Sequence, residues 1–182
     1  MHTRSNSLRC QIVQTQAQFF HAMTVRSICF NHEEKLPYAQ SFDGNDLCST
    51  HIVCYDGEEP IGTLRVRWFS DFAKIERTCV LPAYRSSPAL KIMDIFVHDH
   101  IGRKGYRRSV THASAKYARL WARLFGYKIN KDKGEFHVPG HDLPYYELIK
   151  EIDPIDGALS IDTEAHILSR IEGSWDMPSP LG

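Results

Sequence analysis

Several common features are missing from this sequence, and each absence excludes a class of protein. No run of about 18 apolar residues occurs, so no segment is expected to cross a membrane as a helix. The first residues, MHTRSNSLRCQ, lack the apolar stretch of a secretion signal. Lysine plus arginine equals aspartate plus glutamate at 22 each, so no excess of positive charge is available for nucleic acid. We therefore predict a cytoplasmic protein without nucleic-acid or membrane partners.

The chain also lacks the spacings of a disulfide framework or a metal site. Its cysteines are odd in number and far apart, which is typical of reduced thiols. The ten histidines form no ligand pattern with the cysteines, so we expect no metal cofactor. The five cysteines are Cys10, Cys29, Cys48, Cys54 and Cys79.

The composition that is present is that of a globular protein. With 182 residues, 42% of them apolar and 24% charged, the chain is long enough for one domain of ordinary size. Three consecutive strands suggest an antiparallel meander, and the order of elements predicts an α+β or α/β fold with helices on a mixed sheet. Strands are predicted at 9–15, 51–69 (a hairpin), 73–81, 106–114, 127–130 and 144–152, and helices at 17–33, 88–104 and 115–126.

Two segments stand apart from this pattern. Residues 31–50 are polar and form a long connection, and connections of this length are often functional. From Asp153 the sequence changes character, and IDTEAHILSRIEG predicts one amphipathic helix capped by Asp162 or Thr163. We therefore divide the chain into a domain of residues 1–152 and an extension of residues 153–182.

The stretch VLPAYRSSPALKIM, residues 80–93, turns a strand into a helix without any glycine. The N-terminus of a helix favours an anion, because its first N–H groups are unpaired. Pro88 suits the first helical turn, and Ser86 or Ser87 would serve as N-cap. The turn is either an anion site that has lost its glycines or an ordinary connection.

Three stretches resemble the GNAT superfamily of N-acyltransferases. SFDGNDLCSTHIVCYDGEEPIGTLRVR is similar to a segment with the FDG-x-D pattern in one branch of that superfamily. AKIERTCVLPAYR is similar to the fourth strand and the start of the cofactor loop. VTHASAKYARLWARLFGYKI, followed by KGEFHVPGH, is similar to the late strand, the helix and the closing strand. The resemblance covers about residues 9–152 and implies a mixed, mostly antiparallel central sheet flanked by helices.

The resemblance implies a donor site around the glycine-free turn. GNAT proteins usually hold the coenzyme A pyrophosphate with a glycine-rich turn, but the two glycine positions here hold Pro88 and Leu90. The main chain at the end of the preceding strand would still hold the pantetheine arm, and Arg85 with helix N–H groups would bind a phosphate in another pose. The implied donor-binding residues are Cys79, Val80, Leu81, Arg85, Ser86, Ser87 and Ala89.

The resemblance also implies three candidates for catalysis. Glu76 lies where GNAT proteins often place a general base, and partial burial would raise its pKa. The alternative is a structural ion pair of Glu76 with Lys74 or Arg65. Tyr117 lies about one turn before the place of the family's thiolate-protonating tyrosine. His141 lies in the closing segment near the acceptor site and can accept a proton near neutral pH.

The candidates for acceptor binding lie at the end of the long connection. Asp43 and Asp46 flank Gly44, where they would recognise an ammonium group, order the acceptor loop, or simply form a turn. His51, at the start of the next strand, would cap that loop or take part in catalysis.

These residues predict transfer of an acyl group, most simply acetyl from acetyl-CoA or another acyl-CoA, to a small-molecule primary amine. The amine would attack the thioester directly, because Cys79 has no evident partner base. One alternative is a synthase of N-acyl amino acids or acyl-homoserine lactones that uses acyl carrier protein, since such enzymes lack the glycine-rich loop. The basic stretch RKGYRR would then dock the carrier, or it is a solvated helix end. The other alternative is a binding module without catalysis. The oligomeric state stays open, with a dimer as one option.

Overall fold

The protein is represented by a computed structural model, of which residues 8–177 are described. Eight strands form one sheet in the order β1-β2-β3-β4-β5-β8-β6, and β7 pairs with β8. Among these strands only β4 and β5 run parallel, so the predicted mixed and mostly antiparallel sheet is confirmed. The strands are β1 Leu8–Ile12, β2 Thr50–Asp56, β3 Glu59–Trp68, β4 Ala73–Val80, β5 Arg108–Ser114, β6 Lys128–Ile129, β7 Glu135–Phe136 and β8 Tyr145–Glu151.

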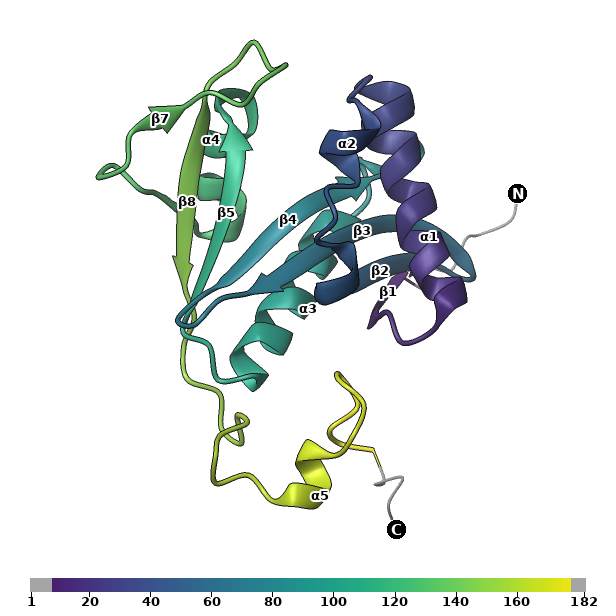
Figure 1. The fold of residues 1–182 in the computed structure, drawn as a ribbon, viewed down its shortest axis with the longest axis vertical. Coiled ribbons are helices and arrows are strands. Elements are labelled where there is room, and N and C mark those ends of the chain that lie inside the picture. Colours follow the sequence, from purple (N-terminus) through teal and green to yellow (C-terminus); the bar gives the residue numbers. More distant parts are fainter. Residues whose placement is uncertain (1–7, 178–182) are drawn as a thin grey trace.

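Helices cover both faces of the sheet (Figure 1). Alternation along β2 explains this, because Ile52 and Cys54 face one core, whereas Val53 and Tyr55 face the other. Helix α3 packs on the first face through Met93, and α1 packs on the second. The helices are α1 Gln16–Arg26, η1 Ser27–Glu33, α2 Tyr38–Ser41, η2 Asp46–Cys48, η3 Pro82–Tyr84, α3 Ala89–Arg103, α4 Ala115–Phe125 and α5 Ala165–Leu168.

The helix predicted over residues 17–33 is present, but its second half changes form. Helix α1 begins with a capping box, in which Thr15 accepts from the Gln18 N–H and the Gln18 side chain accepts from the Thr15 N–H. The continuation η1 is a π-helix, a form that is rare and frequent at functional sites. It ends at Glu33, and Lys35 just beyond has a φ of 58°.

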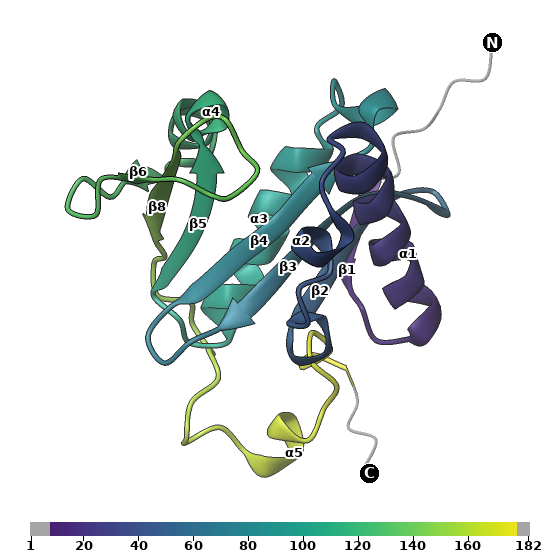
Figure 2. The ribbon, with the colours of Figure 1, turned by 45° about the horizontal axis from the view of Figure 1, so that its top comes forward.

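Strands β4 and β5 are joined for only three residue pairs. Ala73, Lys74 and Ile75 pair with Ser109, Val110 and Thr111, and no pairing follows. Figures 1 and 2 both show the two strands diverging beyond this point. A β-bulge adds to the distortion of β4, because the register against β3 shifts between Thr63 and Arg65 and Arg77 has a φ of 53°. The sheet is therefore open at one end.

The turn between β4 and α3 is built by local hydrogen bonds. The N-cap of α3 is Pro88, which provides no side-chain cap, so the N-cap predicted at Ser86 or Ser87 is wrong. The Ser87 Oγ accepts from the Ala89 N–H at 3.3 Å and donates to the Tyr84 carbonyl at 2.6 Å. Gly105 follows the helix with a φ of 85°, as expected for a residue just after a helix end.

A helix is present within the C-terminal extension, but it is shorter than the segment IDTEAHILSRIEG and has another N-cap than predicted. Only Ala165–Leu168 is helical, and its N-cap is Glu164 rather than Asp162 or Thr163. The Thr163 hydroxyl accepts from the Ser160 N–H and so closes a turn instead of capping a helix.

Tertiary contacts hold the rest of the extension against the far end of α3. The Glu172 carboxylate lies 3.1 Å from His100 Nε2, 2.7 Å from Lys104 Nζ and 3.1 Å from Thr50 Oγ1. The Trp175 ring stacks on His100 with ring centres 5.2 Å apart. The proposed boundary at residue 152 stays a prediction.

The sequence predicts neither a membrane-spanning helix nor a metal site, and residues 8–177 can be searched for both. No helix there is both long and apolar enough to cross a membrane. The same residues contain no group of three or more histidine, cysteine or acidic side chains placed to hold a metal ion.

Candidate active site

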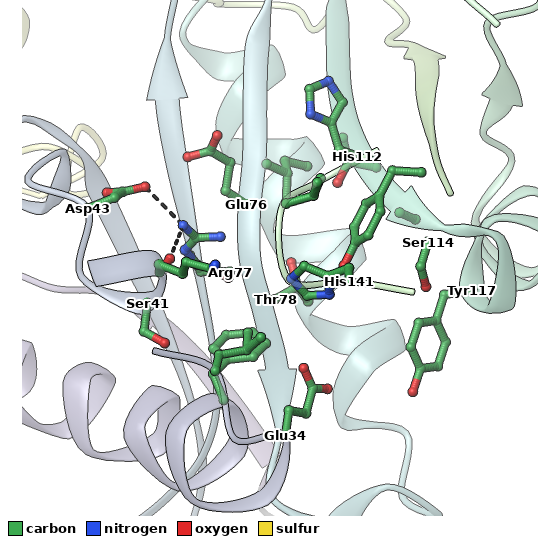
Figure 3. Close-up of a pocket in the computed structure, with 18 of the residues that line it drawn as sticks. Glu34, Ser41, Asp43, Glu76, Arg77, Thr78, His112, Ser114, Tyr117 and His141 are labelled. Atoms are coloured by element: carbon green, nitrogen blue, oxygen red, sulfur yellow. Dashed lines mark hydrogen bonds and ion pairs between the residues drawn. The ribbon is translucent and has the colours of Figure 1, made fainter. Parts of the chain in front are cut away.

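A cavity of about 540 Å³ lies where β4 and β5 diverge. Figure 3 shows residues of β4 on one side and residues of β5 and α4 on the other, with η1 below. Four of the proposed site residues line the cavity, and so does Lys74, which we considered as an ion-pair partner of Glu76. The four are Asp43, Glu76, Tyr117 and His141. The long connection, the bulged strand and the closing segment thus meet at one place.

A group of charges centred on the buried Arg65 lies on the β3–β4 side of the cavity, and two of its members, Asp43 and Glu76, line it. We call Asp43, Asp46, Arg65 and Glu76 the Arg65 cluster. The Arg65 guanidinium lies 2.7 and 2.8 Å from the two Asp43 oxygens, 3.0 Å from Asp46 Oδ1 and 2.6 Å from Glu76 Oε2. Its side chain is 1% exposed. Arg65 therefore ties the connection to two strands of the sheet.

The two aspartates have different places in this cluster. Asp43 lines the cavity, and the Arg65 guanidinium holds the pKa of its carboxyl well below the usual range. Asp46 does not line the cavity; its Oδ1 lies 2.5 Å from Arg26 Nη1. Burial raises the pKa of Asp46, but Arg26 and Arg65 outweigh this effect and lower it. Asp46 is thus placed to hold the loop rather than to meet a ligand.

The raised pKa that we expected for Glu76 is wrong. Burial does raise the pKa of this carboxyl, but hydrogen bonds from Lys74 and Arg65 outweigh it, so the net shift is downward. Lys74 Nζ lies 2.8 Å from Glu76 Oε1. The structural ion pair that we considered as the alternative is present.

His51 lies behind the cavity and does not line it. The side chain is buried, its Nε2 lies 3.0 Å from the Asp46 carbonyl, and its ring meets Phe19 edge-on. Burial lowers the pKa of His51. The contact with Asp46 fits the predicted role of His51 in fixing the loop.

His141 and Tyr117 lie on the side of the cavity opposite the Arg65 cluster (Figure 3). His141 Nδ1 is 3.1 Å from the Tyr145 hydroxyl, and both residues line the cavity. Tyr117 is in the first turn of α4 and is 42% exposed. These side chains can exchange protons with a ligand in the cavity.

The groups expected to hold the donor phosphate already have partners. Arg85 forms a two-point ion pair with Glu33, with N–O distances of 2.6 and 2.5 Å, and its Nε donates to the Val80 carbonyl at 3.1 Å. The Ser87 N–H donates to the Tyr84 carbonyl at 3.0 Å. Of the expected anion-binding groups, only the Ser86 N–H has no described partner.

The end of β4 is also partly engaged. The Leu81 N–H donates to the Ile61 carbonyl at 2.8 Å, so this amide is not available to a pantetheine arm as we expected. Cys79 does not line the cavity, and burial raises the pKa of its thiol well above the usual range. A thiol of this kind is a poor nucleophile, in line with the direct attack that we expect.

Several cavity residues escaped the sequence analysis. Glu34 is the C-cap of the π-helix, Arg77 occupies the bulge, and His112 and Tyr145 come from β5 and β8. Arg77 Nη2 lies 3.0 Å from Asp43 Oδ2 and also donates to the Gln40 carbonyl. The bulge could not be read from KIERTCVL, which is a continuous strand pattern.

The basic stretch proposed to dock a carrier protein is largely paired within the molecule. Arg103 Nη1 lies 2.6 Å from Asp176 Oδ2, Lys104 contacts Glu172, and Arg108 Nε lies 3.0 Å from Glu151 Oε1. These contacts fit a helix end and a strand held by ion pairs.

Comparison of amino-acid sequences identifies known proteins that are similar to this chain. No protein-family model matches it. The uncharacterized protein YyaT of Bacillus subtilis (strain 168) is 30% identical over 143 residues, which is 77% of this chain and 93% of that protein. The uncharacterized N-acetyltransferase YjcF of the same organism is 28% identical over 144 residues, which is 79% of this chain and 100% of that protein.

Solved structures share the fold. A protein assigned as an N-acetyltransferase in Lactobacillus plantarum has a TM-score of 0.73 at 21% identity, covering 81% of this chain and 99% of its own. An acyl-CoA N-acyltransferase from Pseudomonas aeruginosa has a TM-score of 0.67 at 18% identity, covering 79% and 99%. FeeM, an N-acyl amino acid synthase from uncultured soil microbes, has a TM-score of 0.68 at 10% identity, covering 83% and 93%.

The fold, with its cavity between diverging parallel strands, is of the acyltransferase type. Taken with the sequence relatives, it identifies the family: the chain belongs to the GNAT superfamily of N-acyltransferases. It is therefore an acyltransferase rather than a binding module without catalysis.

Proposed function

We propose that this enzyme transfers an acetyl or other acyl group from a coenzyme A thioester to a small-molecule primary amine. The observation that carries the proposal is the divergence of β4 from β5 after Ile75. From Glu76 to the end of β4, no described strand pairs with the edge that faces the cavity. A pantetheine arm contains two amide groups and can pair with such an edge as an added strand does.

The chemistry would take place beside the bulge of β4. The amine nitrogen attacks the thioester carbonyl carbon, the carbon–sulfur bond breaks, and an amide and a free thiol result. The amine must lose one proton and the leaving sulfur must gain one. We propose His141, oriented by Tyr145, as the proton acceptor and Tyr117 as the proton donor to sulfur. Glu76 is a weaker base than we expected, because Lys74 and Arg65 stabilise its charged form.

The donor phosphates are proposed to meet Arg85 and the Ser86 N–H at the start of α3. Both terminal nitrogens of Arg85 are bound by Glu33, so a phosphate that used them would displace Glu33. The β4 edge from Glu76 would then carry more of the donor binding than it does in relatives with a glycine-rich turn.

The shortage of free anion-binding groups at the N-terminus of α3 favours a second candidate donor. An acyl carrier protein presents its thioester on an arm with one phosphate and no adenine nucleotide, which needs fewer groups at the α3 N-terminus. FeeM, whose fold is similar, is named as an N-acyl amino acid synthase. The internal ion pairs of residues 103–108 argue against carrier docking at that stretch.

Titration calorimetry with acetyl-CoA, followed by measurement of thiol release with a panel of primary amines, tests the proposal. We expect a dissociation constant on the order of micromolar and thiol release with at least one amine. Turnover of acyl carrier protein without binding of acetyl-CoA would support the second candidate. If neither acetyl-CoA nor the acyl carrier protein supports binding and acyl transfer, the proposal is overturned.

A variant that fills the cavity sharpens this test. Ser114 lies at the end of β5 on the cavity wall, so Ser114→Trp should abolish donor binding. Leu124→Trp, at a position of α4 that is 55% exposed and outside the cavity lining, is the matched control. Circular dichroism confirms that both variants fold. Equal donor binding by the two variants would contradict a donor site in this cavity.

A further inference from the structure

Three carboxylates line the cavity, and Glu34 differs from the other two. Asp43 is bound by Arg65 and Arg77, and Glu76 is bound by Arg65 and Lys74. No hydrogen bond or ion pair joins the Glu34 carboxylate to another residue within 8–177. Its negative charge is therefore the one that the cavity wall leaves unmatched.

The main chain fixes the position of Glu34. It is the C-cap of η1, and its N–H donates to the Cys29 carbonyl at 3.1 Å. The carboxylate points into the cavity from below, on the side of Thr78 and Tyr117 (Figure 3). The preceding residue, Glu33, instead forms its ion pair with Arg85 and does not line the cavity. Two adjacent glutamates at the end of η1 thus have different surroundings.

The surroundings of Glu34 disfavour its charge in the empty cavity. Burial and the charge of Glu33 raise the pKa of Glu34. Arg85, His141 and Lys116 act on it at longer range, but Arg85 is engaged by Glu33 and His141 by Tyr145. A cation bound in the cavity could form an ion pair with the Glu34 carboxylate, and no described side chain forms one.

We propose that Glu34 binds a positively charged group of the acceptor, so that the substrate is a primary amine carrying a second cationic group. This inference rests on the function proposed above. The bound cation is not the reacting amine, because a carboxylate stabilises the ammonium form and the attacking nitrogen must be neutral. The aromatic rings of Phe30, Tyr117 and Tyr145 in the cavity lining suit a cation and an alkyl linker.

Matched amines test the assignment without knowledge of the natural acceptor. The probes are 1,4-diaminobutane, 4-amino-1-butanol and 4-aminobutanoate, together with their homologues of three to six carbons. All share the reacting amine and differ only in the charge of the far end. Titrated into the protein saturated with coenzyme A, the diamines should bind about tenfold or more tighter than the amino alcohols, since a charge-assisted hydrogen bond is made only with the diamine. The amino acids should bind weakest.

Glu34→Gln should remove this preference and leave the affinity for acetyl-CoA unchanged. Asp142→Asn is the control, because Asp142 is an exposed carboxylate beside His141 that does not line the cavity. The control should keep the preference for diamines. Where an amine is turned over, the ratio of kcat/KM between diamine and amino alcohol should follow the same pattern.

Each other outcome overturns the inference. Equal binding of diamines and amino alcohols by the wild-type protein does so, as does absence of binding by every probe. A preference that persists in Glu34→Gln also does so. Loss of acetyl-CoA binding by the wild-type protein would instead contradict the proposed function, and calorimetry distinguishes the two failures.

Discussion

Two ionic clusters hold this fold together, and they differ in burial and in place. The Arg65 cluster lies beside the cavity, and its central side chain is 1% exposed. The Glu172 cluster, formed by Glu172 with His100, Lys104 and Thr50, lies at the far end of α3. There the Glu172 side chain is 35% exposed. Figure 1 shows the C-terminal segment away from the divergence of β4 and β5.

Ion pairs contribute differently to stability in the two clusters, because one is buried and the other is partly exposed. A buried charge that loses its partner stays without water, so breaking a buried pair costs far more than breaking an exposed one. In the cavity wall, Asp43 and Glu76 are paired with Arg65, Arg77 and Lys74, whereas Glu34 has no such partner among the described residues. The Glu172 cluster has no contact with the cavity and only attaches the extension. Variants at the two clusters should therefore separate stability from activity.

The largest effect is expected for Arg65→Ala. Three carboxylates would lose their common partner in a buried place, so unfolding free energy should fall by about 3–5 kcal/mol. Urea unfolding measures the loss. Arg67→Ala is the control, because Arg67 is 30% exposed and its Nη1 lies 3.9 Å from Glu76; it should cost less than about 1 kcal/mol. Similar losses for both variants would contradict the special place of Arg65.

A smaller effect is expected for Glu172→Gln. The amide keeps the shape of the side chain but loses its charge, so unfolding free energy at pH 7 should fall by about 1–2 kcal/mol. Acyl transfer should be unchanged, because the cluster lies outside the cavity. Reduced activity in a variant that is folded at the assay temperature would contradict the separation of the two ends.

The effect of Glu172→Gln should also depend on pH. Burial raises the pKa of Glu172, but His100 and Lys104 outweigh this and lower it to about 2. In the unfolded chain a glutamate titrates near a pKa of about 4.3. Since the folded value is the lower one, the stabilisation is complete above about pH 5 and is lost as pH falls toward 2. The gap between wild type and variant should shrink over that range, and a constant gap would contradict the account.

Next in size is Gly173→Ala, which tests the attachment of the extension without changing a charge. An added Cβ would lie 2.4 Å from Ile12 Cδ1, so either the Ile12 side chain or the segment must shift. Gly157→Ala is the control, since Gly157 has a similar φ of 73° and open space around it. The difference between the two variants should be about 1 kcal/mol in unfolding free energy. Equal values would mean that the Ile12 contact is unimportant.

The smallest change in stability is expected for Glu33→Gln, because Glu33 and Arg85 meet at the surface. Its effect on the donor should be larger. Freed from Glu33, Arg85 becomes available to a phosphate, so coenzyme A should bind several-fold tighter. Titration calorimetry measures this, and weaker binding would show that Arg85 is not a phosphate partner.

Much of the fold could be predicted from the sequence because its signals are local. Alternating apolar residues gave the meander of β2, β3 and β4, and the predicted α4 ends at Gly126, whose φ is 74°. The helix predicted within residues 161–173 is limited to Ala165–Leu168, because the apolar positions around it have no core to cover, and Ile161 is 95% exposed. Helical periodicity without a packing partner does not hold a helix in water.

The candidate site was predictable in its place but not in its partners. Asp43, Glu76, Tyr117 and His141 line the cavity, whereas Asp46, His51 and Cys79 do not, and the roles proposed for all of them stay predictions. The charge state of Glu76 was misjudged, because Lys74 and Arg65 reach it only once β3 and β4 pair. Glu34 gave no signal at all, since NHEEK reads as an ordinary polar helix end.

By itself the sequence determined the order of strands and helices, the mixed sheet and the membership of the GNAT superfamily. Periodicity and turn chemistry are properties of neighbouring residues, so they can be read along the chain. Only the tertiary structure decided which charges are neutralised and which is left for a ligand. Glu33 finds Arg85 across 52 positions, while Glu34 beside it finds none among the described residues. The environment of a charge depends on what the folded chain brings around it, and no local pattern carries that information.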